Sequence, residues 1–247
     1  MPRGLGGGII LRNASCERHR IMTADEIETP ILDNWLGPFR FSHGLASKRW
    51  RDRKVPILLK RKGQVDERQF IPVADFPPTL VLPFAANEPT LITTGIGGRV
   101  HWKDVFLARD NDKLVAFRKR HSADDIFIEA HIPAAKFVRF LAKIAHGVAI
   151  SQFGFSFEPL LLDVIEGTGF ESASLFIGAE TKKLDKPERP RSHIVRTRLI
   201  HADEMRIIAV TLQFFCAFPT PPYLALAGLF EAGTHPEWER ADAAISA

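Results

Sequence analysis

The sequence predicts an α+β protein in which an antiparallel sheet packs with one long amphipathic helix. Short apolar runs separated by turn residues fill much of residues 173–229, and such runs are typical of strands. Apolar side chains recur at helical spacing between Pro133 and Phe153, which indicates a helix with one face in the core. The chain has 247 residues, 45% of them hydrophobic, which is enough for one large domain or two small ones.

Charge and cysteine content narrow the class of protein. The formal net charge is +4 and the sequence pI is about 9.2, which is compatible with an anionic partner. No run approaches the roughly 20 apolar residues of a membrane helix, and Arg3 and Arg12 interrupt what would be a signal peptide. The two cysteines, Cys16 and Cys216, make no disulfide framework. These features predict a cytoplasmic protein without a membrane partner.

The N-terminal stretch has the densest local signals. The four glycines among residues 1–8 predict a turn, and Ile9–Leu11 is long enough for one short strand. Asn13 or Ser15 is a suitable helix cap, and Cys16 and His19 then share a face of the first helical turn, because they lie three positions apart.

Helix and hairpin signals follow. Residues Thr23–Glu26 fit a capping box, so a helix is expected to restart there, and Pro30 predicts a kink or a break. Two apolar runs on either side of Gly63 predict a β-hairpin that turns near this glycine.

Residues 37–71 contain the most basic stretch of the chain. Its first part is opposed by a single carboxylate, Asp52, and Phe39, Phe41 and Trp50 are interleaved with it. The cations are Arg40, Lys48, Arg49, Arg51, Arg53, Lys54, Lys60, Arg61 and Lys62. Two interpretations stay open: the cations protect the edges of a solvated strand pair, or they form a contact surface for nucleic acid.

The middle of the chain is predicted to be irregular. Proline and glycine are frequent in residues 72–98, which indicates a linker or a long loop around one strand at Thr79–Leu82. In residues 113–132, short apolar and charged runs predict strands on either side of a basic turn at Arg118–His121.

The C-terminal part, residues 99–247, is predicted to be a mixed body built around the long helix. A shorter helix is expected at Glu158–Glu166, ended by Gly167. Strands are expected at Ala173–Ile177, His193–Ile200, Arg206–Phe218 and Tyr223–Leu229. The almost continuous apolar run from Ile207 to Phe218 predicts the central strand of the sheet.

The N-terminal stretch resembles the second half of an HNH endonuclease motif, the ββα-metal or treble-clef finger. The residues that carry this likeness are Pro2, Leu5, Gly6, Gly7, Asn13, Cys16 and His19. The resemblance implies that residues 1–36 form a partial finger, with Asn13 as the middle Asn of the catalytic site. It also implies that Cys16 and His19 are ligands of a structural zinc ion, and zinc accepts thiolate and imidazole alike.

Two parts of the family's pattern have no counterpart in the chain. The family's catalytic His would lie three residues before Pro2, ahead of Met1, and the first Cys-x-x-Cys knuckle is absent. Four ligands complete a structural zinc site, and Cys16 and His19 supply two. Either the true start lies upstream, or the chain is a natural truncation. An upstream extension that contained the catalytic His and the first knuckle would imply an active nuclease that uses a divalent metal ion.

The resemblance therefore predicts a bacterial HNH-family protein that is inactive as a nuclease in this form. DNA is the expected partner, through the basic stretch. The alternative expectation is a non-catalytic module that binds nucleic acid or another protein.

Overall fold

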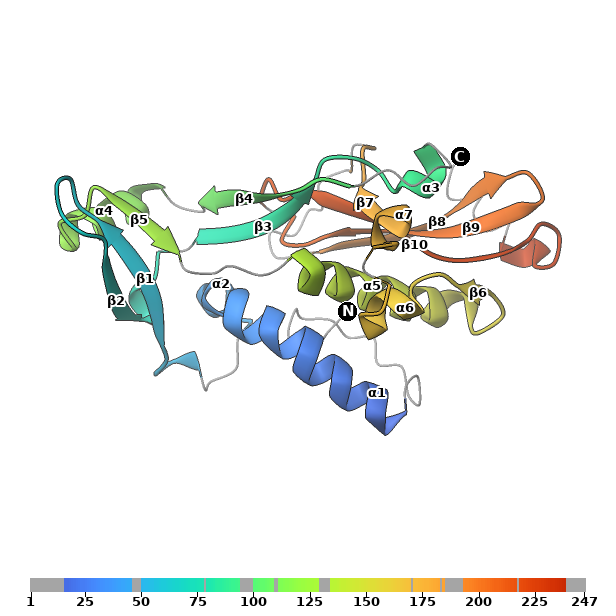
Figure 1. Cartoon of the computed structure of the whole chain (residues 1–247), viewed down its shortest axis with the longest axis horizontal. Helices are drawn as coiled ribbons and strands as arrows, with labels where there is room; N and C mark the ends of the chain where they lie inside the picture. The colour runs from blue at the N-terminus through green and yellow to red at the C-terminus, as the bar shows by residue number, and fades with distance from the viewer. Residues whose placement is uncertain are drawn as a thin grey trace.

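The fold is α+β with antiparallel sheets, as the sequence predicts (Figure 1). The computed structural model describes residues 16–45, 50–77, 79–93, 100–108, 111–128, 134–169, 171–182, 184, 193–216 and 218–238. The expected N-terminal turn, the strand at 9–11 and Asn13 lie outside these residues.

The main body is a five-stranded sheet packed against helix α5 (Ala134–Phe153). Its strand order is β6–β10–β9–β8, and β7 also pairs with β10. These strands are β6 (Glu158–Pro159), β7 (Ile177–Ala179), β8 (Ile194–Ala202), β9 (Met205–Gln213) and β10 (Pro222–Glu231). Strand β9 lies between β8 and β10, which confirms the central position that its apolar run predicts.

Helix α5 occupies the predicted residues and is buried on more than one side. The apolar positions expected in the core, such as Phe137 and Leu141, are completely buried. Ala142 and Ala145 are buried too, because the sheet covers one side of α5 and the N-terminal helices cover another (Figure 1). The helix is therefore the centre of the main core.

The N-terminal helices form one helical run with a bend at Leu36. The run comprises α1 (Glu17–Met22), η2 (Thr23–Glu28), η3 (Pro30–Trp35) and α2 (Gly37–Ser42). The predicted restart at Thr23 is wrong, and of the kink or break predicted at Pro30, the break is wrong. Both η2 and η3 are wide π-helical turns, and Pro30 takes the first position of η3, so the helix continues through both sites.

The same helices belong to the main core. Ile27 and Ile31 are completely buried, and the Trp35 ring meets Phe137 of α5 edge-on, with ring centroids 5.4 Å apart. The described part of residues 1–36 thus packs with the C-terminal body.

A smaller lobe lies at the other end of the molecule (Figure 1). It contains β1 (Lys54–Lys60), β2 (Glu67–Pro72), β5 (Asp125–Ile128) and helix α4 (Asn111–Arg120). Its sheet order is β2–β1–β5, and its core is Ile57, Leu59, Ile71, Phe76, Leu114, Phe117 and Ile126. The hairpin turns at Gly63, whose φ of +76° suits glycine, and this confirms the predicted turn.

The lobe changes two expectations about residues 99–132. The stretch before the basic cluster is helix α4, with Arg118 and Arg120 in its last turn, so the strand expected there is wrong. Leu114 and Phe117, three positions apart, form the buried face of this helix. Strand β5 pairs with β1, so part of the stretch assigned to the C-terminal body belongs to the hairpin.

A two-stranded ribbon joins the two parts. It consists of β3 (Thr79–Ala85) and β4 (Trp102–Ala108), and the short helices η5 (Val73–Asp75) and α3 (Thr90–Thr93) lie before and after β3. The stretch expected to be a linker thus contains a longer strand than predicted. Leu80 and Leu82 belong to the main core, and the buried Tyr223 hydroxyl donates to the Pro83 carbonyl at 2.6 Å.

Two short helices complete the body. Helix α6 (Leu162–Glu166) ends at Gly167, as predicted, and Gly167 has a φ of +88°. The first half of the helix predicted at 158–166 is instead β6 and an irregular turn. Helix α7 (Ala173–Phe176) replaces most of the strand predicted at 173–177. In the part of the chain that the structure describes, no helix has the length and apolar character needed to cross a membrane.

Candidate nucleic-acid interface

The three-stranded sheet of the small lobe has one buried face and one outer face. Ile57 and Leu59 are completely buried beneath α4, so the residues that alternate with them on β1 point the other way. Residues directly opposite each other on antiparallel strands share a face. The register places Phe70 opposite Pro56, and Arg68 opposite Leu58. On β1 and β2 the outer face therefore includes Lys54, Pro56, Leu58, Lys60, Arg68 and Phe70. The register with β5 adds Asp125, opposite Lys60, to the same face.

This outer face combines an exposed aromatic ring with cations. Phe70 is 58% exposed, although it lies within a strand. The guanidinium carbon of Arg68 lies 5.3 Å from the centre of the Phe70 ring, within the range of a cation–π contact. Pro56 and Leu58, on the same face, are half-buried. The face thus presents an aromatic ring, a stacked guanidinium and two lysines, with the carboxylate of Asp125 opposite Lys60.

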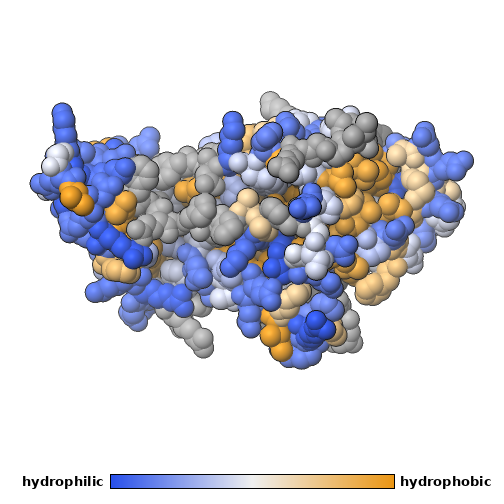
Figure 2. Space-filling model, in the orientation of Figure 1, coloured by the Kyte–Doolittle hydropathy of each residue, from blue (hydrophilic) through white to orange (hydrophobic). Residues whose placement is uncertain are grey.

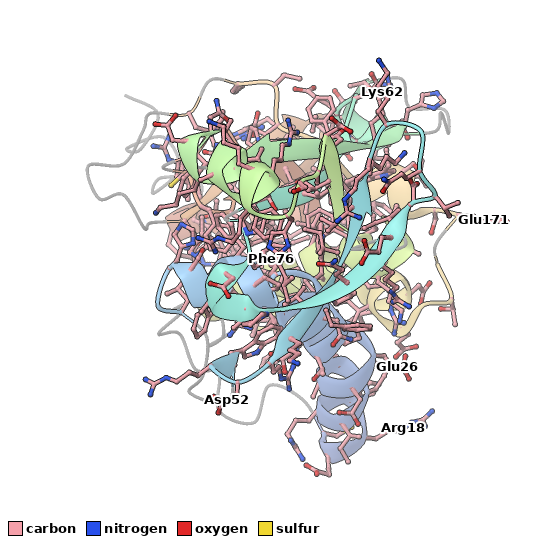
Figure 3. All side chains as sticks on the ribbon, turned by 90° about the vertical axis from the view of Figure 1, so that its left-hand side faces the viewer. Arg18, Glu26, Asp52, Lys62, Phe76 and Glu171 are labelled. Atoms are coloured by element: carbon pink, nitrogen blue, oxygen red, sulfur yellow. The ribbon has the colours of Figure 1, made fainter. Side chains whose placement is uncertain are left out.

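Most of the predicted basic residues surround this face. Arg51, Arg53 and Lys54 are exposed at the start of β1, and the Arg53 guanidinium lies 4.6 Å from the centre of the buried Trp50 ring. Lys62 is exposed at the hairpin turn, and Lys60 lies 3.7 Å from Asp66. Figure 3 shows the lobe from its free end, with Lys62 and Asp52 at opposite ends of the hairpin and Phe76 between them.

Two of the predicted cations have structural roles. Arg61 donates to the carbonyls of Ser122 at 3.1 Å and His121 at 3.0 Å and pairs with Glu67, so it holds the hairpin to the end of α4. Arg40 is only 5% exposed, in the helical run of the main body.

The Arg40 guanidinium forms hydrogen bonds with residues in and next to that helical run. It donates to the carbonyl of Leu32 at 2.6 Å and to the Asp33 carboxylate at 3.3 Å, and more weakly to the carbonyl of Leu45 at 3.4 Å. Burial lowers the pKa of Arg40, and Asp33 partly offsets this. Arg40 therefore does not belong to the exposed basic surface. Lys48 and Arg49 lie outside the described residues.

Helix α4 adds further cations to the lobe, although it follows the hairpin by about forty residues in the sequence. Lys113, Lys119 and Arg120 are exposed on it, and Arg118 pairs with Asp125 at 2.7 Å. Residues 50–77 and 111–128 together hold eleven Lys and Arg against seven Asp and Glu, a surplus equal to the +4 of the whole chain. The rest of the chain is balanced, so the small lobe carries the net positive charge. Its surface in Figure 2 is mostly hydrophilic.

Cys16 and His19 form a second polar cluster, at the start of the helical run. The Cys16 sulfur lies 3.0 Å from Nδ1 of His19, and Nε2 of His19 lies 3.2 Å from the carboxylate of Glu166 in α6. His19 lowers the pKa of the Cys16 thiol through its backbone amide and its ring, while Cys16 and then Glu166 raise the pKa of His19. Glu166 lies 147 positions from His19, and no sequence signal links the two.

The expected zinc ion is not matched by a full ligand set in the described residues. Cys16 and His19 contact each other and supply two of the four ligands of a structural site. Among residues whose positions are described, no group of three or more His, Cys, Asp or Glu side chains could hold a metal ion. In the structure, this cluster links the N-terminal helical run to α6.

Comparison with known proteins finds no relative: no protein family, no curated protein and no solved structure matches this chain. The resemblance of residues 2–19 to the HNH motif therefore stays a prediction.

Proposed function

We propose that the protein binds nucleic acid through its small lobe and, in this form, does not cleave it. The observation that carries the proposal is the concentration of the net positive charge on this lobe, whose sheet also has an exposed aromatic ring on its outer face. Lysine and arginine side chains displace counterions from phosphates, and this release supplies much of the affinity for nucleic acids.

The positions of Lys54 and Lys60 favour a binding surface over the alternative, in which the cations only protect the edges of the sheet. Cations that only protect a sheet from aggregation are expected on its edge strands. Lys54 and Lys60 instead lie at the ends of β1, which is the central strand of the described sheet. Two lysines there, on the same face as Arg68, form a charged surface rather than a charged edge.

The absence of cleavage follows from the resemblance to the HNH family. The family's general base has no counterpart in residues 1–247, and Asn13 alone cannot activate water. We therefore propose a member of this family that has kept a contact surface for nucleic acid, and expect no cleavage by this polypeptide.

Titration of labelled oligonucleotides at several salt concentrations tests the proposal. We expect affinity to fall steeply with salt, and replacing Arg51, Lys54 and Lys62 together by Gln to lower the salt slope by up to about three. The matched control replaces three exposed cations of the main body, Arg18, Lys136 and Lys182, by Gln.

Several results would overturn the proposal. Equal losses in the two triple variants would show that the lobe has no special role. Salt-independent binding, or no binding at low salt, would exclude a phosphate-contacting surface. Incubation of supercoiled plasmid with the purified protein and Mg²⁺ or Zn²⁺ is expected to leave the plasmid intact, and nicking would show that the polypeptide is a nuclease.

A further inference from the structure

We infer that the outer face of the small lobe binds single-stranded nucleic acid, with one base stacked on the Phe70 ring. This inference rests on the proposed function and specifies its ligand. The starting observation is that Phe70 exposes 58% of its surface in the middle of a described strand. A single exposed apolar side chain is common on protein surfaces, so the informative feature is the combination of this ring with cations on the same sheet face.

Phe70 has no role in the lobe core. Of the seven buried residues of that core, four lie on the opposite face of the sheet, two lie on α4, and Phe76 directly follows η5; Phe70 is not one of them. Its neighbours on the outer face include Pro56, directly across from it, and Arg68. The ring is therefore held in position without being covered.

Cations lie on both sides of this ring along the neighbouring strand. Lys54 precedes Pro56 by two residues, and Lys60 follows it by four, so both share its face. Successive residues on one face of a strand are about 6.6–6.8 Å apart. Lys54 thus lies roughly one such step from the Phe70–Pro56 pair. Lys60 lies roughly two steps from this pair in the opposite direction.

This arrangement complements a single strand better than a duplex. A base can stack on a side-chain ring only when its own face is free, and the bases of a duplex are already stacked on each other. Single-strand binders combine aromatic rings with a basic track for the phosphates. Phe70 supplies the ring, Arg68 a stacked cation, and Lys54 and Lys60 the charges along the strand.

Replacement of Phe70 by Ala tests the inference against a matched control. Phe155, which is 75% exposed after α5 in the main body, provides the control variant Phe155→Ala. We expect Phe70→Ala to weaken binding of a single-stranded oligothymidylate by about tenfold, the usual effect of removing one stacked base. Its salt slope should stay at the wild-type value, since no phosphate contact is removed. Phe70→Trp should retain the affinity.

The experiment distinguishes failure of this inference from failure of the proposed function. If the wild-type protein binds neither single strands nor duplex, the proposed function is wrong. If it binds nucleic acid but Phe70→Ala behaves like Phe155→Ala, or if duplex is preferred, stacking on Phe70 is wrong while phosphate binding stands. Thermal unfolding of each variant checks the fold, and we expect unchanged midpoints, because neither ring is buried.

Discussion

Replacing Arg40 by Met separates a structural role of this residue from a binding role. The Met side chain keeps much of the apolar stem of Arg40 but none of its donors. Because Arg40 is 5% exposed and its guanidinium donates into the helical run, we expect the variant to be less stable and to bind nucleic acid as the wild type does.

The expected loss of stability follows from the contacts of the guanidinium. A buried carbonyl left without its donor costs about 1–3 kcal/mol, and the Leu32 carbonyl, 2.6 Å from Nη1, is the main partner. The Leu45 contact at 3.4 Å adds less. Asp33 is 41% exposed, so its ion pair contributes only about 0–1 kcal/mol. We expect the free energy of unfolding to fall by about 2–4 kcal/mol, a large share of a typical 5–15 kcal/mol.

Urea unfolding followed by tryptophan fluorescence, together with oligonucleotide binding, measures both quantities. The control is Arg51→Met, an exposed cation of the small lobe, which should change stability by no more than about 0.5 kcal/mol and weaken binding. An Arg40→Met variant with wild-type stability but reduced affinity would refute the reasoning, because Arg40 would then act as a surface cation.

Two further predictions concern buried polar contacts of the main body. Tyr223→Phe removes the hydroxyl that donates to the Pro83 carbonyl at 2.6 Å, so the free energy of unfolding should fall by about 1–2 kcal/mol in urea titrations; no change would mean that this contact does not stabilise the ribbon. Burial alone would raise the pKa of Glu180, but hydrogen bonds from Arg198, the Lys182 amide and Thr211 hold it below its ordinary value. The stability due to Glu180 is therefore present above its unfolded pKa of about 4.3 and is lost as the pH falls through the folded pKa. Glu180→Gln should cost about 1–3 kcal/mol near neutral pH, with a deficit that shrinks in acid, and a deficit independent of pH would contradict this assignment.

Local patterns explain what could be predicted from the sequence. The helix at Ala134–Phe153, the hairpin turn at Gly63 and the helix end at Gly167 depend on spacing and backbone preference within a few residues. The errors occurred where the local signal was ambiguous. Pro30 is a helix breaker in most contexts, but a wide π-helical turn accommodates it.

At the candidate interface, local sequence patterns do not decide which side chains are exposed. The alternation of residues 67–72 places Phe70 and Ile71 on opposite faces of a strand, and a register shift of one residue would exchange them. Only the burial of Ile71 in the lobe core decides that Phe70 faces outward. In the same way, Arg40 and Arg51 are equivalent as sequence positions in a basic stretch, and burial separates them.

The sequence by itself determined the α+β class, the positions of the long helix and the main strands, and the surplus of positive charge, because each depends on composition or on neighbouring residues. The tertiary structure alone decided that β5 joins the hairpin, that α4 brings its cations to it, and that His19 meets Glu166. These contacts join segments tens to more than a hundred positions apart, and they form because apolar faces of distant elements are buried together.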